Sequence, residues 1–277
     1  MGGRSPPRAT DRPVGGSLGP IVTSAILPSP AADPAPGPEP APGAGAAARP
    51  VLALRGVGKT YPNGKIALRD VDLTLGEGEF VFLVGPSGAG KSTLLKLLIR
   101  DELPTAGEVV VDGQDLARVP RRKVPELRRR IGIVFQDFKL LPTRSVRENV
   151  AFALEVTGTP RGRIAPAVER ALAVVGLSAQ ADQLPMTLSG GEQQRTAIAR
   201  ALVHEPRLII ADEPTGNLDP LISWEIIQLL LRINELGVTV LMATHNAEVV
   251  TSLRRRVVGL EEGRIVRDEV GGYHRED

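Results

Sequence analysis

Eight consecutive residues have the types and spacing needed to hold a phosphate group. Gly85-Pro86-Ser87-Gly88-Ala89-Gly90-Lys91-Ser92 fits the pattern G-x-x-x-x-G-K-[ST] and lies between an apolar run and a segment with helical spacing. Glycines let the backbone curl so that its N–H groups face phosphate oxygens, and the positive end of the following helix faces the same anion. We expect Lys91 to reach the β- and γ-phosphates of a nucleotide and Ser92 to bind Mg²⁺. A ligand-free glycine turn is the alternative, and the context on both sides argues against it.

A pair of carboxylates follows another apolar run. Leu208–Ala211 reads as a buried strand and is followed directly by Asp212 and Glu213. A strand that ends in this way places its carboxylates at the carboxyl edge of a sheet, where α/β proteins bind ligands. We expect Asp212 to hold Mg²⁺ through water and Glu213 to polarise a water for attack on the γ-phosphate. For an isolated Asp-Glu pair, the alternative is a solvated strand end.

A third motif separates the classes of phosphate-loop proteins. Leu188-Ser189-Gly190-Gly191-Glu192-Gln193-Gln194-Arg195 opens a predicted helix and ends 17 residues before Asp212. Ser189 is expected to cap this helix, and the two glycines permit close approach of an anion to free N–H groups. The three motifs, in this order, resemble those of the ABC-type ATPases over about residues 51–270.

The resemblance implies roles for further residues. Gln136 matches the glutamine that senses Mg²⁺ and the attacking water, and His245 matches the histidine that contacts the γ-phosphate. Asp219, in Asn217-Leu218-Asp219, matches the loop that crosses to a partner subunit. Tyr61 matches the aromatic residue that stacks on adenine, although a simple packing role is the alternative.

The expected cofactors are ATP and Mg²⁺. The expected catalytic residues are Lys91, Gln136, Glu213 and His245, and the expected metal site is Ser92, Gln136 and Asp212. The expected nucleotide contacts are Tyr61, Gly85, Pro86, Ser87, Gly88, Ala89, Gly90, Lys91, Ser92, Thr93, Gln136, Ser189, Gly190, Gly191 and Asp219. The resemblance also implies a head-to-tail homodimer in which each ATP lies between one subunit's phosphate loop and the other subunit's Ser189–Gly191.

Other segments resemble one branch of this family, the bacterial cell-division ATP-binding proteins of the FtsE type. Phe135–Leu141 carries most of this likeness, with Val124–Arg129, Asn149–Leu154 and Val240–His245. The branch implies a peripheral subunit on the cytoplasmic face of the cell membrane, at the division septum. There it would drive an FtsX-like integral membrane protein that regulates cell-wall hydrolysis.

Three alternatives stay open for the function. Ala211–Asp219 is shared with lipoprotein-release and macrolide- or peptide-export ATPases. A soluble DNA-repair ATPase is a second alternative, but only 98 residues separate Lys91 from Ser189, and they contain neither a long insertion nor cysteine. A scaffold that does not hydrolyse ATP is the third, and the intact Lys91, Glu213 and His245 argue against it.

The elements that must position these residues alternate between two periods, which predicts an α/β fold. Strands are expected at 79–84, 109–111, 131–135, 208–211 and 238–243, with a hairpin at 257–266. Helices are expected at 92–100, 145–156, 164–175, 191–204 and 221–236. The resemblance adds a phosphate-loop core with a mixed β-sheet, an antiparallel β-subdomain, and a small helical subdomain at about 137–190.

Composition excludes several classes of site. The chain has 277 residues, a net charge of +2, no cysteine and 3% aromatic residues. Disulfides, zinc–thiolate sites and a cysteine nucleophile are therefore excluded, and we expect no nucleic-acid partner. Residues 1–50 hold 12 of the 24 prolines, so we predict a disordered extension ahead of an ATP-binding domain at 51–277. The alternative is that translation starts at Val51.

Two surface features have competing interpretations. Phe138, Leu140 and Leu141 follow Gln136 and are expected either to line a groove for a short helix of the membrane partner or to join the core of the helical subdomain. Val146, Val150, Ala151 and Leu154 continue this apolar pattern. The basic residues are expected either to contact anionic lipid or to form a solvated helix flank; they are Arg118, Arg121, Arg122, Lys123, Arg128, Arg129 and Arg130.

Overall fold

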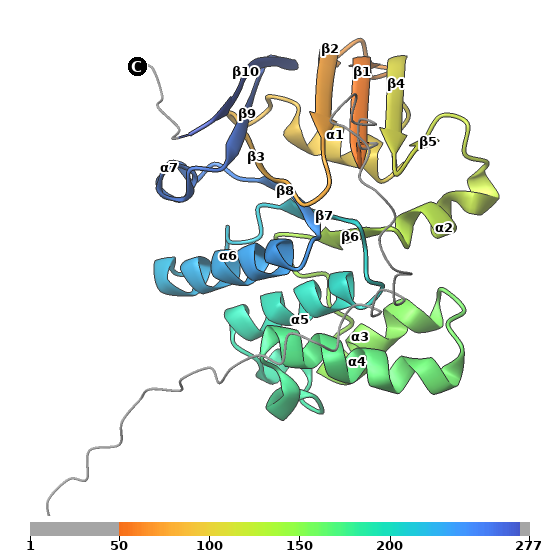
Figure 1. Cartoon of the computed structure of the whole chain (residues 1–277), viewed down its shortest axis with the longest axis vertical. Coiled ribbons are helices and arrows are strands. Elements are labelled where there is room, and N and C mark those ends of the chain that lie inside the picture. The colour runs from red at the N-terminus through yellow and green to blue at the C-terminus, as the bar shows by residue number, and fades with distance from the viewer. Residues whose placement is uncertain (1–49, 272–277) are drawn as a thin grey trace, which may run out of the picture.

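A computed structural model describes residues 50–271, so the predicted extension, apart from Pro50, lies outside the described residues. Four strands form an antiparallel sheet in the order β2-β1-β4-β5, at the top of Figure 1. They are β1 (Leu52–Thr60), β2 (Ile66–Leu75), β4 (Ala106–Val111) and β5 (Gln114–Asp115). This sheet is the antiparallel part that the family resemblance predicted.

A second sheet has the order β10-β9-β3-β8-β7-β6 and carries the phosphate chemistry. Its strands are β3 (Phe80–Val84), β6 (Ile131–Val134), β7 (Leu208–Asp212), β8 (Thr239–Ala243), β9 (Arg256–Glu261) and β10 (Arg264–Val270). All neighbours pair in parallel except β10, which returns antiparallel to β9. The carboxyl ends of β3, β6, β7 and β8 therefore share one edge, where α/β proteins place their ligands.

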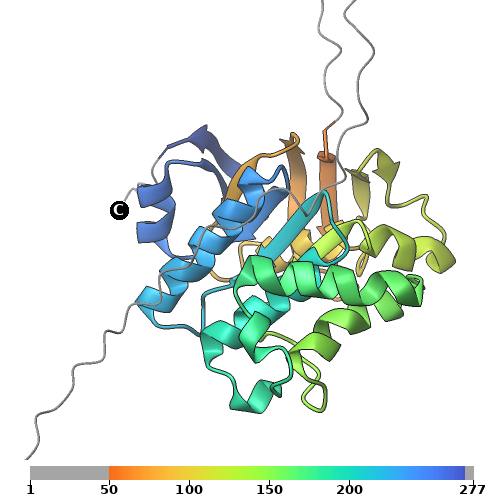
Figure 2. The same ribbon diagram turned by 60° about the horizontal axis from the view of Figure 1, so that its bottom comes forward.

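Helices cover this second sheet on both faces. They are α1 (Lys91–Leu98), α2 (Val124–Arg128), α3 (Val146–Glu155), α4 (Arg161–Val175), α5 (Gly190–Leu202), α6 (Pro220–Glu235) and α7 (Ala247–Leu253), with 3₁₀ turns at Arg121–Lys123, Ser178–Gln180 and Pro185–Thr187. Helix α1 lies between the two sheets, and α3 to α6 lie on the opposite side (Figures 1 and 2). Among the described residues, no helix combines the length and apolar character that a membrane crossing requires.

Two apolar cores follow from the alternation of side chains along the central strand. Phe80, Phe82 and Val84 of β3 pack into the core shared with α3 to α6, whereas Val81 and Leu83 face the core shared with α1 and the antiparallel sheet. A strand buried on both faces needs apolar residues at every position, which is why residues 80–84 form an uninterrupted apolar run.

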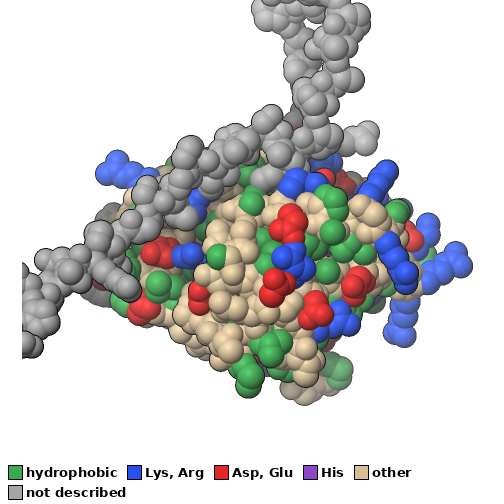
Figure 3. Space-filling model, turned by 90° about the horizontal axis from the view of Figure 1, so that it is seen from below, with side chains coloured by type: hydrophobic (Ala, Val, Ile, Leu, Met, Phe, Trp, Pro, Cys, Tyr) green, Lys and Arg blue, Asp and Glu red, His purple; other side chains and the backbone are tan. Residues whose placement is uncertain are grey.

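The helical layer keeps a polar outer surface. In Figure 3 the underside shows cationic and anionic side chains intermixed. Arg147 pairs with Asp182 at 3.2 Å and also with Glu169, and Arg144 pairs with Glu155 at 3.2 Å. Val146, Val150 and Leu154 point inward and are buried. These three residues therefore belong to the core of the helical layer, and the partly buried Ala151 packs against it.

The basic residues 118–130 are partly neutralised within the chain. Arg118 pairs with Asp115, Arg128 with Asp101 and Arg130 with Asp112. All three residues of the turn Arg121–Lys123 are exposed.

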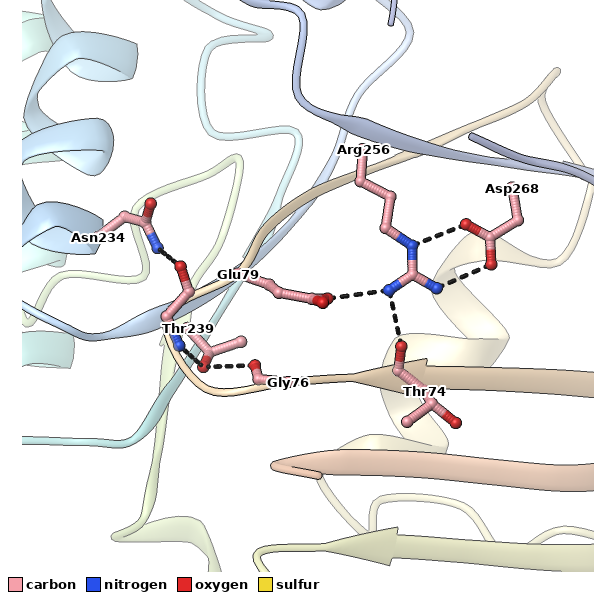
Figure 4. A network of polar contacts seen from close by, with 8 residues as sticks. Thr74, Gly76, Glu79, Asn234, Thr239, Arg256 and Asp268 are labelled. Atoms are coloured by element: carbon pink, nitrogen blue, oxygen red, sulfur yellow. Dashed lines mark hydrogen bonds and ion pairs between the residues drawn. The ribbon is translucent and has the colours of Figure 1, made fainter. Parts of the chain in front are cut away.

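A polar junction ties the two sheets together (Figure 4). Arg256 of β9 donates to both carboxylate oxygens of Asp268 on β10, at 2.7 and 2.8 Å. The same guanidinium donates to Glu79 at 2.9 Å and to the carbonyl of Thr74, at the end of β2, at 2.8 Å. Asn234 of α6 holds the connection between β2 and β3 by donating to the carbonyl of Gly78 at 2.8 Å.

Most predicted elements are present, with shifts of a few residues at their ends. The sequence analysis did not predict β1, β2, α2 or α7 individually. The two helices have only 5 and 7 residues, which is too short to show a helical period, and the two strands have exposed positions that interrupt their apolar character. Helix α4 begins at Arg161 rather than at 164, since its first turn is exposed and carries no apolar pattern.

Candidate functional site

Most of the predicted nucleotide residues line one open pocket of about 620 Å³ at the carboxyl edge of the parallel strands. Its lining includes all of Gly85 to Thr93 together with Tyr61, Gln136, Asp212, Glu213 and His245. Lys65, just before β2, and Ala67, on β2, also line the pocket. The sequence analysis missed both residues. The turn between β1 and β2 that brings them in has no phosphate-binding pattern of its own, so nothing in the sequence pointed to them.

The loop from Gly85 to Gly90 can take its shape only because specific positions lack a side chain. Gly85 has φ +149° and Gly90 has φ +112°. A Cβ on Gly85 would lie 2.1 Å from the carbonyl oxygen of Leu260, and one on Gly90 would lie 2.6 Å from that of Ala67. These two glycines therefore permit close packing of the loop against β9 and β2, as well as the backbone curl.

Helix α1 begins at the mouth of the pocket and presents its positive end there. Its first turn contains no acidic residue that would neutralise the exposed N–H groups. The ammonium group of Lys91 lies across the loop and donates to the carbonyl oxygens of Gly85 (2.6 Å) and Pro86 (3.1 Å). The loop and this lysine form a cationic cradle whose shape suits phosphate oxygens.

Two adjacent carboxylates face this cradle from β7. Asp212 ends the strand, and Glu213 turns away with φ +47°, a left-handed conformation that is costly for a residue other than glycine. Its N–H donates to the carbonyl oxygen of Ala243 at 3.0 Å, which holds the turn against β8. Burial, and next the charge of Glu213, raise the pKa of Asp212, while the charge of Lys91 acts in the opposite direction.

His245 and Glu213 form a direct contact. Nδ1 of His245 lies 2.9 Å from Oε2 of Glu213. The glutamate side chain is only 16% exposed, whereas that of the histidine is 72% exposed. A largely buried carboxylate with an exposed imidazole hydrogen-bonded to it has the geometry of a base whose orientation the second residue sets.

Gln136 reaches the pocket from the end of β6 and contacts the loop that follows Glu213. Its amide nitrogen is 3.5 Å from Oδ1 of Asn217, and the amide of Asn217 donates to the carbonyl of Gln136 at 3.3 Å. A Cβ on Gly216 would lie 2.7 Å from the amide nitrogen of Gln136, so glycine leaves room for this contact. Asn217, which holds Gln136 without lining the pocket, is a further residue that the sequence analysis did not single out by itself.

Tyr61 also lines the pocket, with its hydroxyl 3.2 Å from Oγ1 of Thr93 on α1. Its partly exposed ring flanks the loop Gly85–Gly90. This position suits a base attached to a phosphate chain that runs toward Lys91.

The residues present fit a bound Mg²⁺. Ser92, Gln136 and Asp212 all line the pocket, and their hydroxyl, amide and carboxylate oxygens are the kinds of ligand that Mg²⁺ takes in proteins. Within residues 50–271 no group of three His, Asp or Glu side chains forms a metal cage. Mg²⁺ commonly binds through one or two protein oxygens, with phosphate and water completing its shell.

Four predicted nucleotide contacts lie away from this pocket: Ser189, Gly190, Gly191 and Asp219 are absent from its lining. Ser189 is an exposed N-cap of α5 that accepts a hydrogen bond from the N–H of Glu192, whose carboxylate accepts one in return from the N–H of Ser189. Asp219 caps α6 by accepting from the N–H of Ile222 at 3.0 Å.

Gly191 has a packing role that the sequence analysis did not foresee. It is buried between α5 and α6, and a Cβ there would lie 2.6 Å from Cγ2 of Ile222.

Comparison with known proteins agrees with this geometry. The family model described as "ABC transporter" matches residues 68–216. The cell division ATP-binding protein FtsE of Bacillus subtilis (strain 168) is 52% identical over 224 residues, which cover 81% of this chain and 98% of that protein. FtsE of Mycobacterium tuberculosis is 52% identical over 225 residues (81% and 98%), and that of Escherichia coli K12 is 47% identical over 209 residues (76% and 94%).

Solved structures give the same result for the fold. The ATP-binding cassette MJ0796, described as dimeric and bound to ADP and Pi in a post-hydrolysis state, superposes with a TM-score of 0.70 at 38% identity, covering 79% of this chain and 98% of that one. CbiO1 from Clostridium perfringens, part of an ABC transporter complex, superposes with a TM-score of 0.74 at 33% identity, covering 80% and 88%.

Proposed function

The chain belongs to the ABC transporter family of ATPases and is an FtsE-like member of it, and on this premise we propose that it powers a membrane complex of bacterial cell division. The observation that carries this proposal is the identity of about half of all residues along nearly the whole length of FtsE proteins from three organisms. Within this complex the chain would be a peripheral subunit on the cytoplasmic face of the membrane, at the division septum. Its partner would be an FtsX-like integral membrane protein through which ATP hydrolysis regulates cell-wall hydrolysis.

The residues of the pocket account for hydrolysis in this proposal. Lys91 and the free backbone N–H groups of the loop and of the start of α1 would hold the phosphates in place. Glu213 takes the proton of the attacking water, and its hydrogen bond to His245 keeps the carboxylate pointed at that water. Ser92, Gln136 and Asp212 would hold Mg²⁺, which offsets phosphate charge when bound.

We propose that the active form is a head-to-tail homodimer. Ser189 to Gly191 open a capped helix whose N-terminus is exposed but does not line the pocket of its own chain. A second copy can bring the same helix end over the ATP, so that each nucleotide is bound by both subunits. The dimeric MJ0796 cassette supports this arrangement.

We propose that a short helix of the FtsX-like membrane protein docks beside Gln136. A small pocket of about 310 Å³ is lined by the apolar side chains of Leu95, Ile99, Ile133, Phe135 and Ile210. Lys96, Asp101 and Arg128 also line it, and it reaches Ser92 and Asp212 of the nucleotide site. An amphipathic helix with an apolar face and mixed charges fits such a surface, and contact there lies next to the predicted metal site.

Phe138, Leu140 and Leu141, the residues that the sequence analysis proposed as a docking groove, follow Phe135 in the chain but do not line this small pocket. Phe138, Leu140 and Leu141 are half-buried and belong to neither apolar core. Their backbone is held by Arg200, which donates to the carbonyls of Phe138 and Lys139. Asn149 both donates to and accepts from the main chain of Leu141. These contacts leave the three side chains available at the edge of the docking surface.

Copurification tests the proposal. The tagged protein, extracted from membranes in mild detergent, should bring down one FtsX-like integral membrane protein. Depletion of the ATP-binding protein itself should produce filamentous cells. Lys96→Glu combined with Arg128→Glu should abolish the copurification while the protein still binds ATP. Arg121→Glu combined with Arg122→Glu is the matched control, since these exposed residues lie outside the docking pocket. Copurification with an exported-substrate transporter instead would support the lipoprotein-release or export alternative.

A further inference from the structure

Lys59, two residues before Tyr61, is a buried cation that lies over the Tyr61 ring. It lies near the end of β1, is only 7% exposed, and does not line the nucleotide pocket. Its ammonium group is 5.1 Å from the centroid of the Tyr61 ring. A cation at this distance over an aromatic face is attracted by the π-electrons, and the attraction grows as water is excluded.

Two further contacts hold the ammonium in place. It donates to Oε2 of Glu102 at 2.7 Å and to the carbonyl oxygen of Leu103 at 2.8 Å, both in the connection between α1 and β4. A buried charge without such partners would be strongly unfavourable. The ammonium therefore has one preferred position, and that position is set by the loop after α1 rather than by Tyr61.

The Tyr61 ring is thus restrained in two ways. Its hydroxyl meets Thr93 on the helix that carries the phosphate loop, and one face meets Lys59. A lone tyrosine on a turn would change rotamer freely, and ordering it on binding would cost affinity. With these contacts the ring is oriented before the nucleotide arrives.

We propose that Lys59 is a positioning residue that orders the Tyr61 ring for adenine. Lys59 touches no nucleotide atom in this arrangement, and it acts through the tyrosine. The inference rests on the proposed stacking of Tyr61 on the base. It predicts that Lys59 contributes to affinity for the base and contributes nothing to affinity for the phosphates.

The test compares two ligands in the full-length protein. Lys59→Met keeps the length of the side chain and removes its charge. We expect it to weaken ATP binding by about 3- to 10-fold and to leave the binding of inorganic tripolyphosphate unchanged, both measured by calorimetry. Lys59→Arg should restore most of the ATP affinity. The matched control is Arg55→Met, on the same strand, where an exposed arginine pairs with Glu108 at 3.0 Å far from any ring.

The possible outcomes separate this inference from the function on which it rests. If Tyr61→Ala also leaves ATP affinity unchanged, the adenine contact itself is wrong. If Tyr61→Ala weakens ATP binding and Lys59→Met does not, only the role of Lys59 is overturned. Equal losses for ATP and tripolyphosphate would show that the ion pair merely supports the fold. Should Lys59→Met fail to fold, Glu102→Leu gives the same comparison, because it removes one of the two acceptors that hold the ammonium in place.

Discussion

Glu213 combines three features that suit a base: it is largely buried, it is hydrogen-bonded to His245, and its backbone is held at φ +47°. Such a conformation persists only when the surrounding structure determines it, and here the hydrogen bond to Ala243 does so. Asp212, the adjacent carboxylate, has a raised pKa because it is buried beside the negative charge of Glu213. At the residue scale, the site places negative charge where a cation and a water must bind.

Replacement of Glu213 tests its role as the base. Glu213→Gln keeps the size of the side chain and removes its basicity, so we expect kcat for ATP to fall by about 10²- to 10⁴-fold while ATP binding is retained. Steady-state turnover and nucleotide affinity measure the two effects. Lys91→Ala is the contrasting variant, since it should weaken nucleotide binding itself. Near-normal turnover of Glu213→Gln would refute the assignment.

His204, after the end of α5, predicts a pH effect on stability. Burial, and next the positive charge of Arg129, lower the pKa of this histidine below its ordinary value of 6.5. The unfolded chain therefore binds a proton more readily than the folded one. Stability from this source is fully present above pH 6.5 and is lost as the pH falls toward the lower pKa of the folded state. Urea unfolding at about pH 7.5 and pH 5.5 should show a smaller loss for His204→Gln than for wild type. An equal loss would contradict this.

At the scale of elements, two contacts hold the pieces that carry the site. The close approach of α5 to α6 places Ser189 and Asp219, the two N-caps, at neighbouring helix ends. The Arg256 junction joins β9, β10 and the end of β2 (Figure 4). The first contact depends on the absence of a side chain, and the second on one charged group with several partners.

Gly191 should tolerate no side chain. Because its Cβ would lie 2.6 Å from Ile222, we expect Gly191→Ala to lower the free energy of unfolding by about 1–3 kcal/mol, as overpacking does. Ile222→Leu, which removes the branch at Cβ, should recover part of this loss. Gly162→Ala on α4 is the control, since no atom lies within 4 Å of its Cβ, and it should be neutral or slightly stabilising. Chemical denaturation measures all four proteins.

The junction predicts a cost for removing its arginine. Arg256 is 23% exposed and its partners are 37–40% exposed, so water can replace part of what is lost. We expect Arg256→Met to lower the free energy of unfolding by about 1–2 kcal/mol. Arg118→Met, which removes an ion pair whose arginine is 85% exposed, should cost less than about 0.5 kcal/mol. If the two variants lose the same stability, the junction has no special role.

At the scale of the whole molecule, the proposed ATPase cycle depends on two copies. The pocket of one chain holds the phosphate loop, both carboxylates, Gln136 and His245, but not Ser189 to Gly191. At the start of α5 the N–H groups of Glu192 and Gln193 bond to Ser189, so those of Gly190 and Gly191 are the ones that a phosphate on another subunit would meet. ATP would then stabilise the dimer directly.

Dimerisation can be tested without turnover. In the Glu213→Gln background we expect ATP and Mg²⁺ to convert monomer to dimer, as measured by light scattering. Adding Ser189→Asp should prevent this conversion and leave nucleotide binding by the monomer intact. Aspartate still caps a helix but places a negative charge against the partner's γ-phosphate. An ATP-induced dimer of the double variant would argue that α5 does not face the nucleotide.

Local pattern alone identified the phosphate loop, the strand that ends in Asp212 and Glu213, and the capped start of α5. It could do so because each depends on residues that are close together in the sequence: glycines in a turn, an apolar strand buried on both faces, a serine three residues before a glutamate. The order of these motifs then identified the family.

What the tertiary structure decided is which of these residues meet. It brought Lys65 and Ala67 into the pocket, linked Gln136 to Asn217 across 81 positions, and placed Lys59 over the Tyr61 ring. It also packed Gly191 against Ile222. The sequence had suggested an apolar groove at Phe138, whereas the small apolar pocket of the structure is lined by Ile99 and Phe135 and not by Phe138. Such contacts depend on how sheets and helices pack, and no local periodicity encodes the distance between segments that are far apart in the chain.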